Sequence, residues 1–170
     1  MSLNIEIKAR FTDPELFKNK ISELQTTYVG RDHQTDTFFH VPKGRLKMRE
    51  SSLYGNILIP YIRNDQAGPK KSDYTLIKTD DPIKTKELLT HILGIRVVVE
   101  KEREIYLYEN VRIHLDHVKF LGSFIEFEAV VDDDSEIDKN HLKIQNLLSH
   151  FNIQKEDLIP LAYADLLNTK

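Results

Sequence analysis

Charged and apolar residues alternate strictly in several segments of the sequence. In the first of these segments, Asn4–Arg10, the even positions hold Asn, Glu, Lys and Arg, while positions 5, 7 and 9 hold Ile, Ile and Ala. A period of two is that of a β-strand, because successive side chains of a strand point to opposite faces of the sheet. The alternation therefore predicts strands with one polar and one apolar face.

Eight segments show this period or are rich in β-branched and aromatic residues, and we interpret them as strands. They are residues 3–11, 34–41, 44–50, 56–63, 73–79, 96–108, 111–118 and 122–132. Short connections join several of them, for example residues 42–44 and 109–110. Because such short connections cannot cross over a sheet, we expect neighbouring strands to be antiparallel.

Four segments are predicted to be helices. Asp13-Pro14 and Asp81-Pro82 each supply a capping carboxylate and a proline suited to the first turn. The second of these helices has an apolar stripe and should stop at Gly94; its stripe consists of Leu88, Leu89, Ile92 and Leu93. Ser135 can cap a third helix, and a short helix is expected at 161–167; the core-facing residues of the third are Ile144, Leu147, Leu148 and Phe151.

A few helices beside antiparallel strands define an α+β protein rather than a parallel βαβ sheet. No linker or repeat divides the 170 residues, so we expect a single domain, 1–170. The absence of cysteine excludes disulfides, thiolate catalysis and cysteine-bound zinc. The net charge of −3 argues against nonspecific nucleic-acid binding. A charged N-terminal segment and the lack of a long apolar run argue against a signal peptide or membrane span, so we expect a cytoplasmic protein.

The charges on the predicted strands are sorted by sign. Basic residues recur on the polar faces of several strands, and a pair of carboxylates, Glu126 and Glu128, occupies one late strand. Arginine is frequent among the basic residues, as expected where planar groups bind phosphate oxygens. The alternative interpretation is that these polar strand faces are simply solvated.

The histidines of the predicted strand at 111–118 do not form a metal-binding pair. His114 and His117 are three residues apart and thus lie on opposite faces of the strand, and we interpret them as core or surface residues.

If the sheet closed with these faces inward, the basic side chains would repel one another. Two like charges 4 Å apart cost about 4 kcal/mol at an effective dielectric constant near 20, so such an interior requires an anion. A triphosphate would supply that anion. A hard divalent cation could join it to the carboxylates of Glu6, Glu126 and Glu128.

Six motifs, in this order along the chain, resemble those of the CYTH family, the triphosphate tunnel proteins. The motifs are Asn4-x-Glu6-x-Lys8, Arg45-Leu-Lys-Met-Arg49, Tyr61-x-Arg63, Lys101-x-Arg103, Arg112-x-His114-Leu-Asp116 and Gly122-Ser-Phe-Ile-Glu126-Phe-Glu128. The resemblance implies an eight-stranded antiparallel β-barrel, open as a tunnel, with peripheral helices. It also implies bound Mg²⁺ or Mn²⁺ on Glu6, Glu126 and Glu128. The implied triphosphate-binding residues are Lys8, Arg45, Lys47, Arg49, Arg63, Lys101, Arg103 and Arg112.

Within this family the motifs are most similar to class IV adenylyl cyclases, which implies conversion of ATP to cAMP and pyrophosphate. The expected catalytic residues are Asp116, Lys101 and Arg103. One alternative is hydrolysis of inorganic tripolyphosphate or thiamine triphosphate, and another is a non-catalytic module that binds nucleotide or polyphosphate. Asn4 stands where the family has a glutamate, which removes one negative charge from the expected metal site. A homodimer would agree with a tendency of the family.

Overall fold

The computed structural model describes residues 2–63 and 68–169. Its strands are β1 (Ser2–Arg10), β2 (Thr27–Phe39), β3 (Arg45–Ser51), β4 (Gly55–Arg63), β5 (Lys70–Tyr74), β6 (Ile77–Lys78), β7 (Ile95–Tyr108), β8 (Val111–Val118) and β9 (Gly122–Val131). Its helices are α1 (Pro14–Ser22), α2 (Pro82–Leu93), α3 (Ile137–His150) and α4 (Tyr163–Asn168), with short 3₁₀ turns η1 (Asp134–Glu136) and η2 (Lys155–Asp157).

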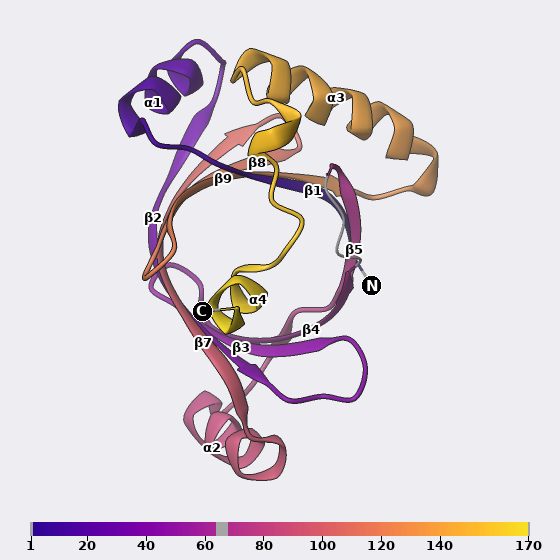
Figure 1. Cartoon of the computed structure of the whole chain (residues 1–170). Coiled ribbons are helices and arrows are strands. Elements are labelled where there is room, and N and C mark those ends of the chain that lie inside the picture. The colour runs from indigo at the N-terminus through magenta and orange to yellow at the C-terminus, as the bar shows by residue number, and fades with distance from the viewer. Residues whose placement is uncertain (1, 64–67, 170) are drawn as a thin grey trace.

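The strands form a closed antiparallel β-barrel (Figure 1). Neighbouring strands follow the order β3-β2-β7-β8-β9-β1-β5-β4, and β4 pairs again with β3, which closes the ring at eight strands. The short strand β6 pairs with β4 at Ile57 and Leu58. The predicted α+β class and the eight-stranded barrel are therefore confirmed.

Most predicted elements agree with the structure, and three differ. Strand β2 begins at Thr27, earlier than predicted, and residues 73–79 are divided between β5 and β6. The division falls at residues 75–76, after Thr75, whose backbone N–H still donates to the carbonyl of Pro60 in β4. Ser135 lies in η1 and Glu136 precedes α3 without a side-chain cap, because the chain enters that helix through a 3₁₀ turn.

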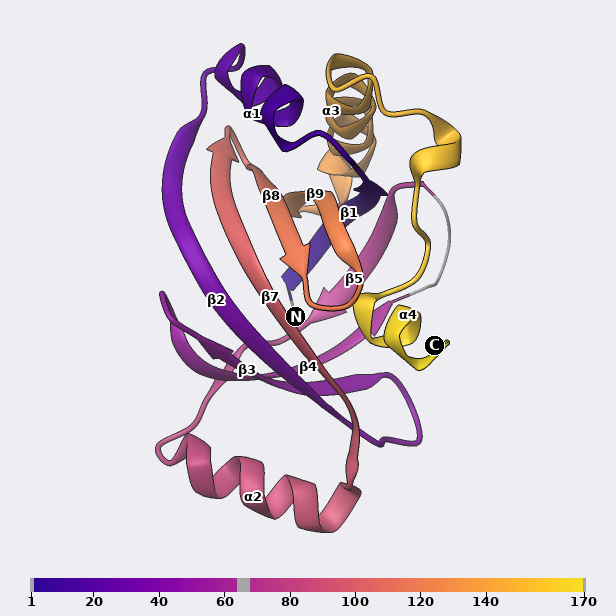
Figure 2. The ribbon, with the colours of Figure 1, turned by 60° about the vertical axis from the view of Figure 1, so that its left-hand side comes forward.

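The main hydrophobic core lies outside the barrel, between its wall and two helices (Figures 1 and 2). Odd-numbered residues of β1, β8 and β9 point outward and pack against α1 and α3. All four residues predicted for the third helix contribute to this core, although Phe151 directly follows the end of α3, and α1 adds two more; the residues are Ile144, Leu147, Leu148, Phe151, Phe17 and Ile21. Because the apolar faces point outward here, the polar faces of the same strands are turned into the barrel.

Helix α4 lies within the outline of the ring when the barrel is viewed along its axis (Figure 1). Its first residues, Tyr163 and Ala164, are buried against a second apolar cluster that includes Phe38, Val99 and Phe124. The rings of Tyr163 and Phe124 meet edge to face at 4.9 Å. This segment therefore fills one end of the barrel interior.

Helix α2 lies at the opposite side of the barrel from α1 and α3 (Figure 2). Its predicted start is confirmed, since the carboxylate of Asp81 accepts from the backbone N–H of Lys84, and the helix ends at Gly94. Its apolar stripe is not buried, however: Ile92 is 70% exposed and Leu88 is 53% exposed. Among the described residues, no helix is long and apolar enough to cross a membrane.

Candidate functional site

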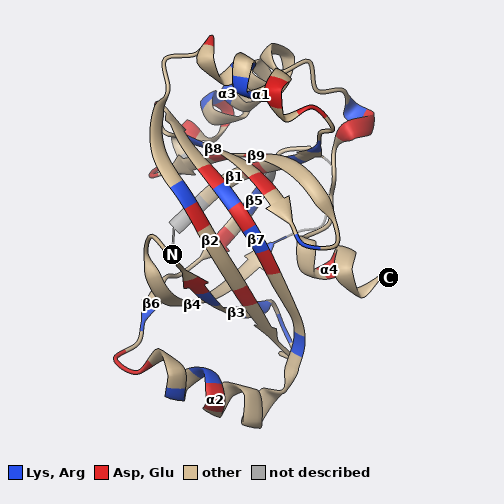
Figure 3. Ribbon diagram, turned by 90° about the vertical axis from the view of Figure 1, so that its left-hand side faces the viewer, with Lys and Arg blue, Asp and Glu red and all other residues tan. Residues whose placement is uncertain are grey.

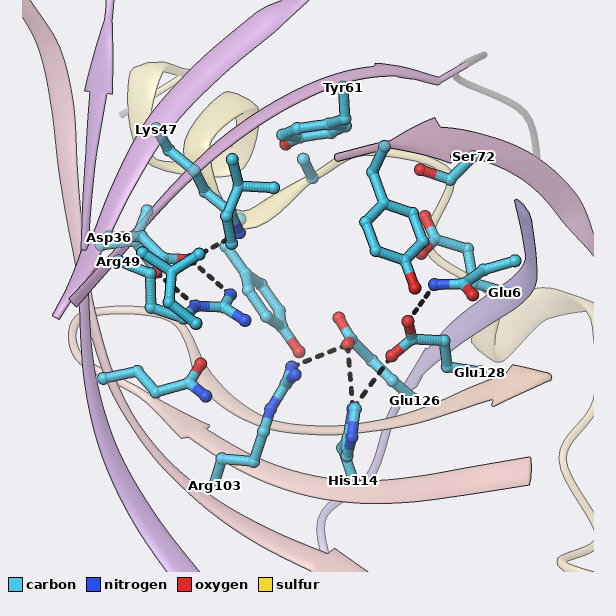
Figure 4. Close-up of a pocket in the computed structure, with 18 of the residues that line it drawn as sticks. Glu6, Asp36, Lys47, Arg49, Tyr61, Ser72, Arg103, His114, Glu126 and Glu128 are labelled. Atoms are coloured by element: carbon cyan, nitrogen blue, oxygen red, sulfur yellow. Dashed lines mark hydrogen bonds and ion pairs between the residues drawn. The ribbon is translucent and has the colours of Figure 1, made fainter. Parts of the chain in front are cut away.

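A cavity of about 490 Å³ occupies the interior of the barrel and is lined mainly by inward-facing strand residues (Figure 4). Bands of both charge signs run along β2 and β7 (Figure 3). Seven of the eight predicted triphosphate-binding residues line the cavity: Lys8, Lys47, Arg49, Arg63, Lys101, Arg103 and Arg112. All three predicted metal ligands, Glu6, Glu126 and Glu128, line it as well. The strand alternation thus brings residues from six strands to one site.

Arg45 and Asp116 do not line the cavity. The Nη2 atom of Arg45 donates to Oδ2 of Asp165 in α4 at 2.7 Å, so this arginine anchors the C-terminal helix. Asp116 is 1% exposed, and its carboxylate accepts two hydrogen bonds from Arg103 at 2.6 Å and one from the hydroxyl of Tyr163 at 2.7 Å. The placement of Asp116 supports a role in holding Arg103 rather than direct contact with a substrate.

Asp36, which the sequence motifs did not single out, is a buried carboxylate surrounded by three of the cationic residues. Arg49 donates to both its oxygens at 2.7 Å, Lys47 donates at 2.7 Å, and the Nζ atom of Lys101 lies 3.8 Å away. Burial alone would raise the pKa of Asp36, but these cations outweigh it and hold the pKa well below the usual range. Asp36 is therefore ionised and keeps the three cations together.

The two lysines beside Asp36 have lowered pKa values. Burial, reinforced by Arg103, lowers the pKa of Lys101 to about 7, although Asp36 opposes the shift. Burial and Arg49 lower the pKa of Lys47 to about 8. Both pKa values are therefore close to neutral pH, so the charge on this side of the cavity depends on pH.

Each predicted metal ligand forms an ion pair with a predicted triphosphate-binding residue. Glu6 accepts from Arg63 at 2.9 Å, and Glu128 lies 3.4 Å from Arg112. Glu126 contacts Arg103 at 2.7 Å and Lys8 at 3.4 Å. Burial would raise the pKa of Glu126, but Arg103 and Lys8 hold it well below its usual range.

His114 lies between the last two carboxylates (Figure 4). Its Nδ1 atom is 3.7 Å from Glu126 and 4.0 Å from Glu128, and it forms no hydrogen bond. The interpretation of His114 as a core or surface residue was therefore incomplete, because it is buried yet lines the cavity. The signal available in the sequence was its spacing: His114 is two residues from both Arg112 and Asp116, so all three share one face of the strand. His117 is exposed on the outer face, as predicted.

The carboxylates on this side of the cavity offer the oxygen ligands that a hard divalent cation prefers. Glu6 and Glu128 are direct partners across β1 and β9, and the side-chain amide of Asn4 donates to Glu128. This leaves the Oδ1 atom of Asn4 buried without a partner. No three carboxylate or histidine side chains of the described residues are already arranged around a metal position. Because Mg²⁺ keeps several waters and needs only one or two carboxylates, the oxygens of Glu128, Glu6 and Asn4 fit such an ion.

A closed barrel whose interior gathers eight cationic side chains and four carboxylates defines a protein that binds a compact polyanion together with a cation. The sequence matches the CYTH domain over residues 2–163, and the chain belongs to that family. Family membership implies action on a triphosphate, by cyclisation or by hydrolysis, with a divalent metal.

Relatives agree with this assignment. A protein of Methanocaldococcus jannaschii provisionally named an adenylate cyclase is 27% identical over 96% of this chain and 98% of its own length. The structure of the PH1012 protein from Pyrococcus horikoshii has a TM-score of 0.83 at 25% identity and covers 98% of this chain and 99% of its own. A provisionally named adenylate cyclase from Vibrio parahaemolyticus has a TM-score of 0.79 at 19% identity, with 98% of both chains covered, and shares the fold.

Proposed function

We propose that the protein is a metal-dependent enzyme that converts ATP to cAMP and pyrophosphate. The observation that carries the proposal is the convergence of eight cationic side chains on one cavity beside four carboxylates. Such an interior suits a triphosphate and a hard cation, and the name of the Methanocaldococcus jannaschii relative favours cyclisation over hydrolysis.

In this proposal the cationic side chains around Asp36 and Asp116, which we call the cationic wall, bind and orient the triphosphate. They are Lys47, Arg49, Lys101 and Arg103. Arg49 and Arg103 are already fixed by Asp36 and Asp116 respectively, so their guanidinium groups lose little freedom on binding phosphate. The 3′-hydroxyl oxygen attacks the α-phosphorus, the bond from that phosphorus to the bridging oxygen of the β-phosphate breaks, and the hydroxyl proton leaves to water. Fixed cations stabilise the negative charge that develops on the departing pyrophosphate.

Glu128, Glu6 and the Oδ1 atom of Asn4 would hold the divalent cation, with Glu126, the third predicted ligand, beside them in its pairs with Arg103 and Lys8. When bound, that cation neutralises phosphate charge. We assign Asp116 to positioning: it holds Arg103, and its link to Tyr163 joins that arginine to α4. Catalytic contact is assigned to Lys101 and Arg103, which line the cavity.

The test is incubation of the purified protein with ATP and Mg²⁺ or Mn²⁺, followed by measurement of cAMP, pyrophosphate and orthophosphate. We expect cAMP and pyrophosphate in equal amounts. Orthophosphate without cAMP would instead establish a triphosphatase, and bound ATP without product would establish a binding module. Glu128→Gln should lower the rate about tenfold or more, while Glu102→Gln, on the exposed face of β7, should not change it.

A further inference from the structure

One wall of the cavity is apolar, in contrast to its charged surroundings. The turn before β4, strands β4 and β5 and the segment entering β6 contribute Tyr54, Ile57, Ile59, Tyr61, Tyr74 and Leu76 to the lining. Figure 4 shows Tyr61 on this side, across the cavity from Arg103 and His114. None of the family-like motifs accounts for this wall, since they include only Tyr61.

The strand register brings the two tyrosines of this wall together, since Tyr61 on β4 is directly opposite Tyr74 on β5. Ile57 is opposite Lys78 on β6, which also lines the cavity and marks a charged border of the wall. Leu76 precedes β6 on the same side, so it lies near the inward residues of β4. The wall is also open to solvent at its edge, where Tyr54 and Leu76 are each 56% exposed.

An apolar wall contributes nothing to binding an inorganic triphosphate, whose whole surface is charged oxygen. It would instead face water beside the bound anion, which is unfavourable. The organic part of a nucleotide is different, because its base has an aromatic face that stacks on tyrosine rings and packs against aliphatic side chains. Since this wall faces the cations that bind the phosphates, the occupant suited to it is another part of the same substrate molecule.

We propose that the wall formed by these six residues binds the aromatic ring of an organic triphosphate and selects against inorganic tripolyphosphate. This inference rests on the proposed function, since it requires the triphosphate to lie on the cationic wall. It assigns specificity to the apolar side chains of β4, β5 and the segment before β6, while the cationic side chains of the cavity supply the part of the affinity that every triphosphate shares.

The test compares dissociation constants for 3′-deoxy-ATP, which lacks the attacking hydroxyl, and for tripolyphosphate, both measured by calorimetry with Mg²⁺. Tyr74→Ala should weaken binding of 3′-deoxy-ATP about tenfold, in the range found for lost base stacking, and should leave tripolyphosphate binding within about twofold. Tyr74→Phe should retain the wild-type preference because its ring is kept.

Leu76 and Ile77 provide a matched pair. Both are exposed apolar residues, but only Leu76 lines the cavity. Leu76→Ser should weaken the binding of 3′-deoxy-ATP about threefold, and Ile77→Ser should leave the dissociation constants of both ligands unchanged. Melting temperatures will show that each variant is folded.

An equal loss for both ligands, or no loss for 3′-deoxy-ATP in either cavity variant, would overturn the proposed ring site while leaving triphosphate binding intact. If the wild-type protein bound neither ligand, the proposed function itself would fail.

Discussion

The charge of Lys101 should control how the affinity for a triphosphate changes with pH. Its pKa is lowered to about 7, so the ammonium is charged below that pH and loses its proton as the pH rises. A bound anion favours the charged form, and affinity should therefore fall by about tenfold between pH 7 and 8.5 through this group. The measurement is tripolyphosphate binding without metal across this range.

Lys101→Gln is the matched control for that experiment, because the ionisation of the ligand is the same with both proteins. The variant should bind more weakly at pH 6.5 and should show a flatter pH profile than wild type. Lys47, whose pKa is about 8, remains to give a residual slope at higher pH. Parallel profiles for the two proteins would show that Lys101 does not contribute.

Asp36 should be essential to the stability of the cationic wall. Asp36→Asn leaves the partly buried Arg49 and Lys47 without their carboxylate, and removal of the buried partner from such an ion pair should cost about 3 kcal/mol in free energy of unfolding. Urea unfolding measures this. Glu100→Gln removes an exposed pair with Lys119 and should change that free energy by less than about 0.5 kcal/mol. A similar small change for both variants would contradict the role of Asp36.

These residues also show why only part of the site could be predicted from the sequence. Alternation within a strand places Arg49, Arg103 and Glu126 on inward faces without knowledge of the partners. It does not reveal that Asp36 pairs with Arg49, since the contact depends on the register between β2 and β3. It also does not show that Arg45 is held by Asp165, because α4 approaches β3 only in the folded chain.

At the level of elements, two helices with similar sequence patterns differ in what they bury. Helix α3 buries Ile144 completely against the barrel, whereas α2 has no buried residue. An apolar stripe indicates which face of a helix would be buried but does not specify the surface that covers it. The eight strands were easier to predict because the same alternation had to be satisfied along the whole barrel wall.

Two alanine substitutions test this difference. Ile144→Ala should lower the free energy of unfolding by about 3 kcal/mol, because it opens a cavity in the outer core. Ile92→Ala, at a 70% exposed position of α2, should change it by less than about 0.5 kcal/mol. Urea unfolding of the full chain provides both values. A loss at Ile92 comparable to that at Ile144 would mean that α2 is covered by another surface in solution.

At the level of the whole molecule, the interior is a set of internal ion pairs that a substrate and its cation would replace together. Glu6 pairs with Arg63, and Glu128 pairs with Arg112. A cation that entered alone would compete with these arginines for the carboxylates, and a triphosphate that entered alone would face the carboxylates. Joint entry preserves the charge balance, so each ligand should increase the affinity for the other.

We therefore expect Mn²⁺ to tighten tripolyphosphate binding about tenfold, within the usual range of coupling between two ligands. Together the two ligands should raise the melting temperature by more than the sum of their separate effects. Mn²⁺ also binds tripolyphosphate in solution, so the comparison is with Glu128→Gln, in which that solution equilibrium is unchanged but the carboxylate is lost. The enhancement should be much smaller in this variant. Equal enhancement in both proteins would show that the coupling arises in solution rather than in the barrel. It would contradict the proposal that the two ligands replace the internal ion pairs together.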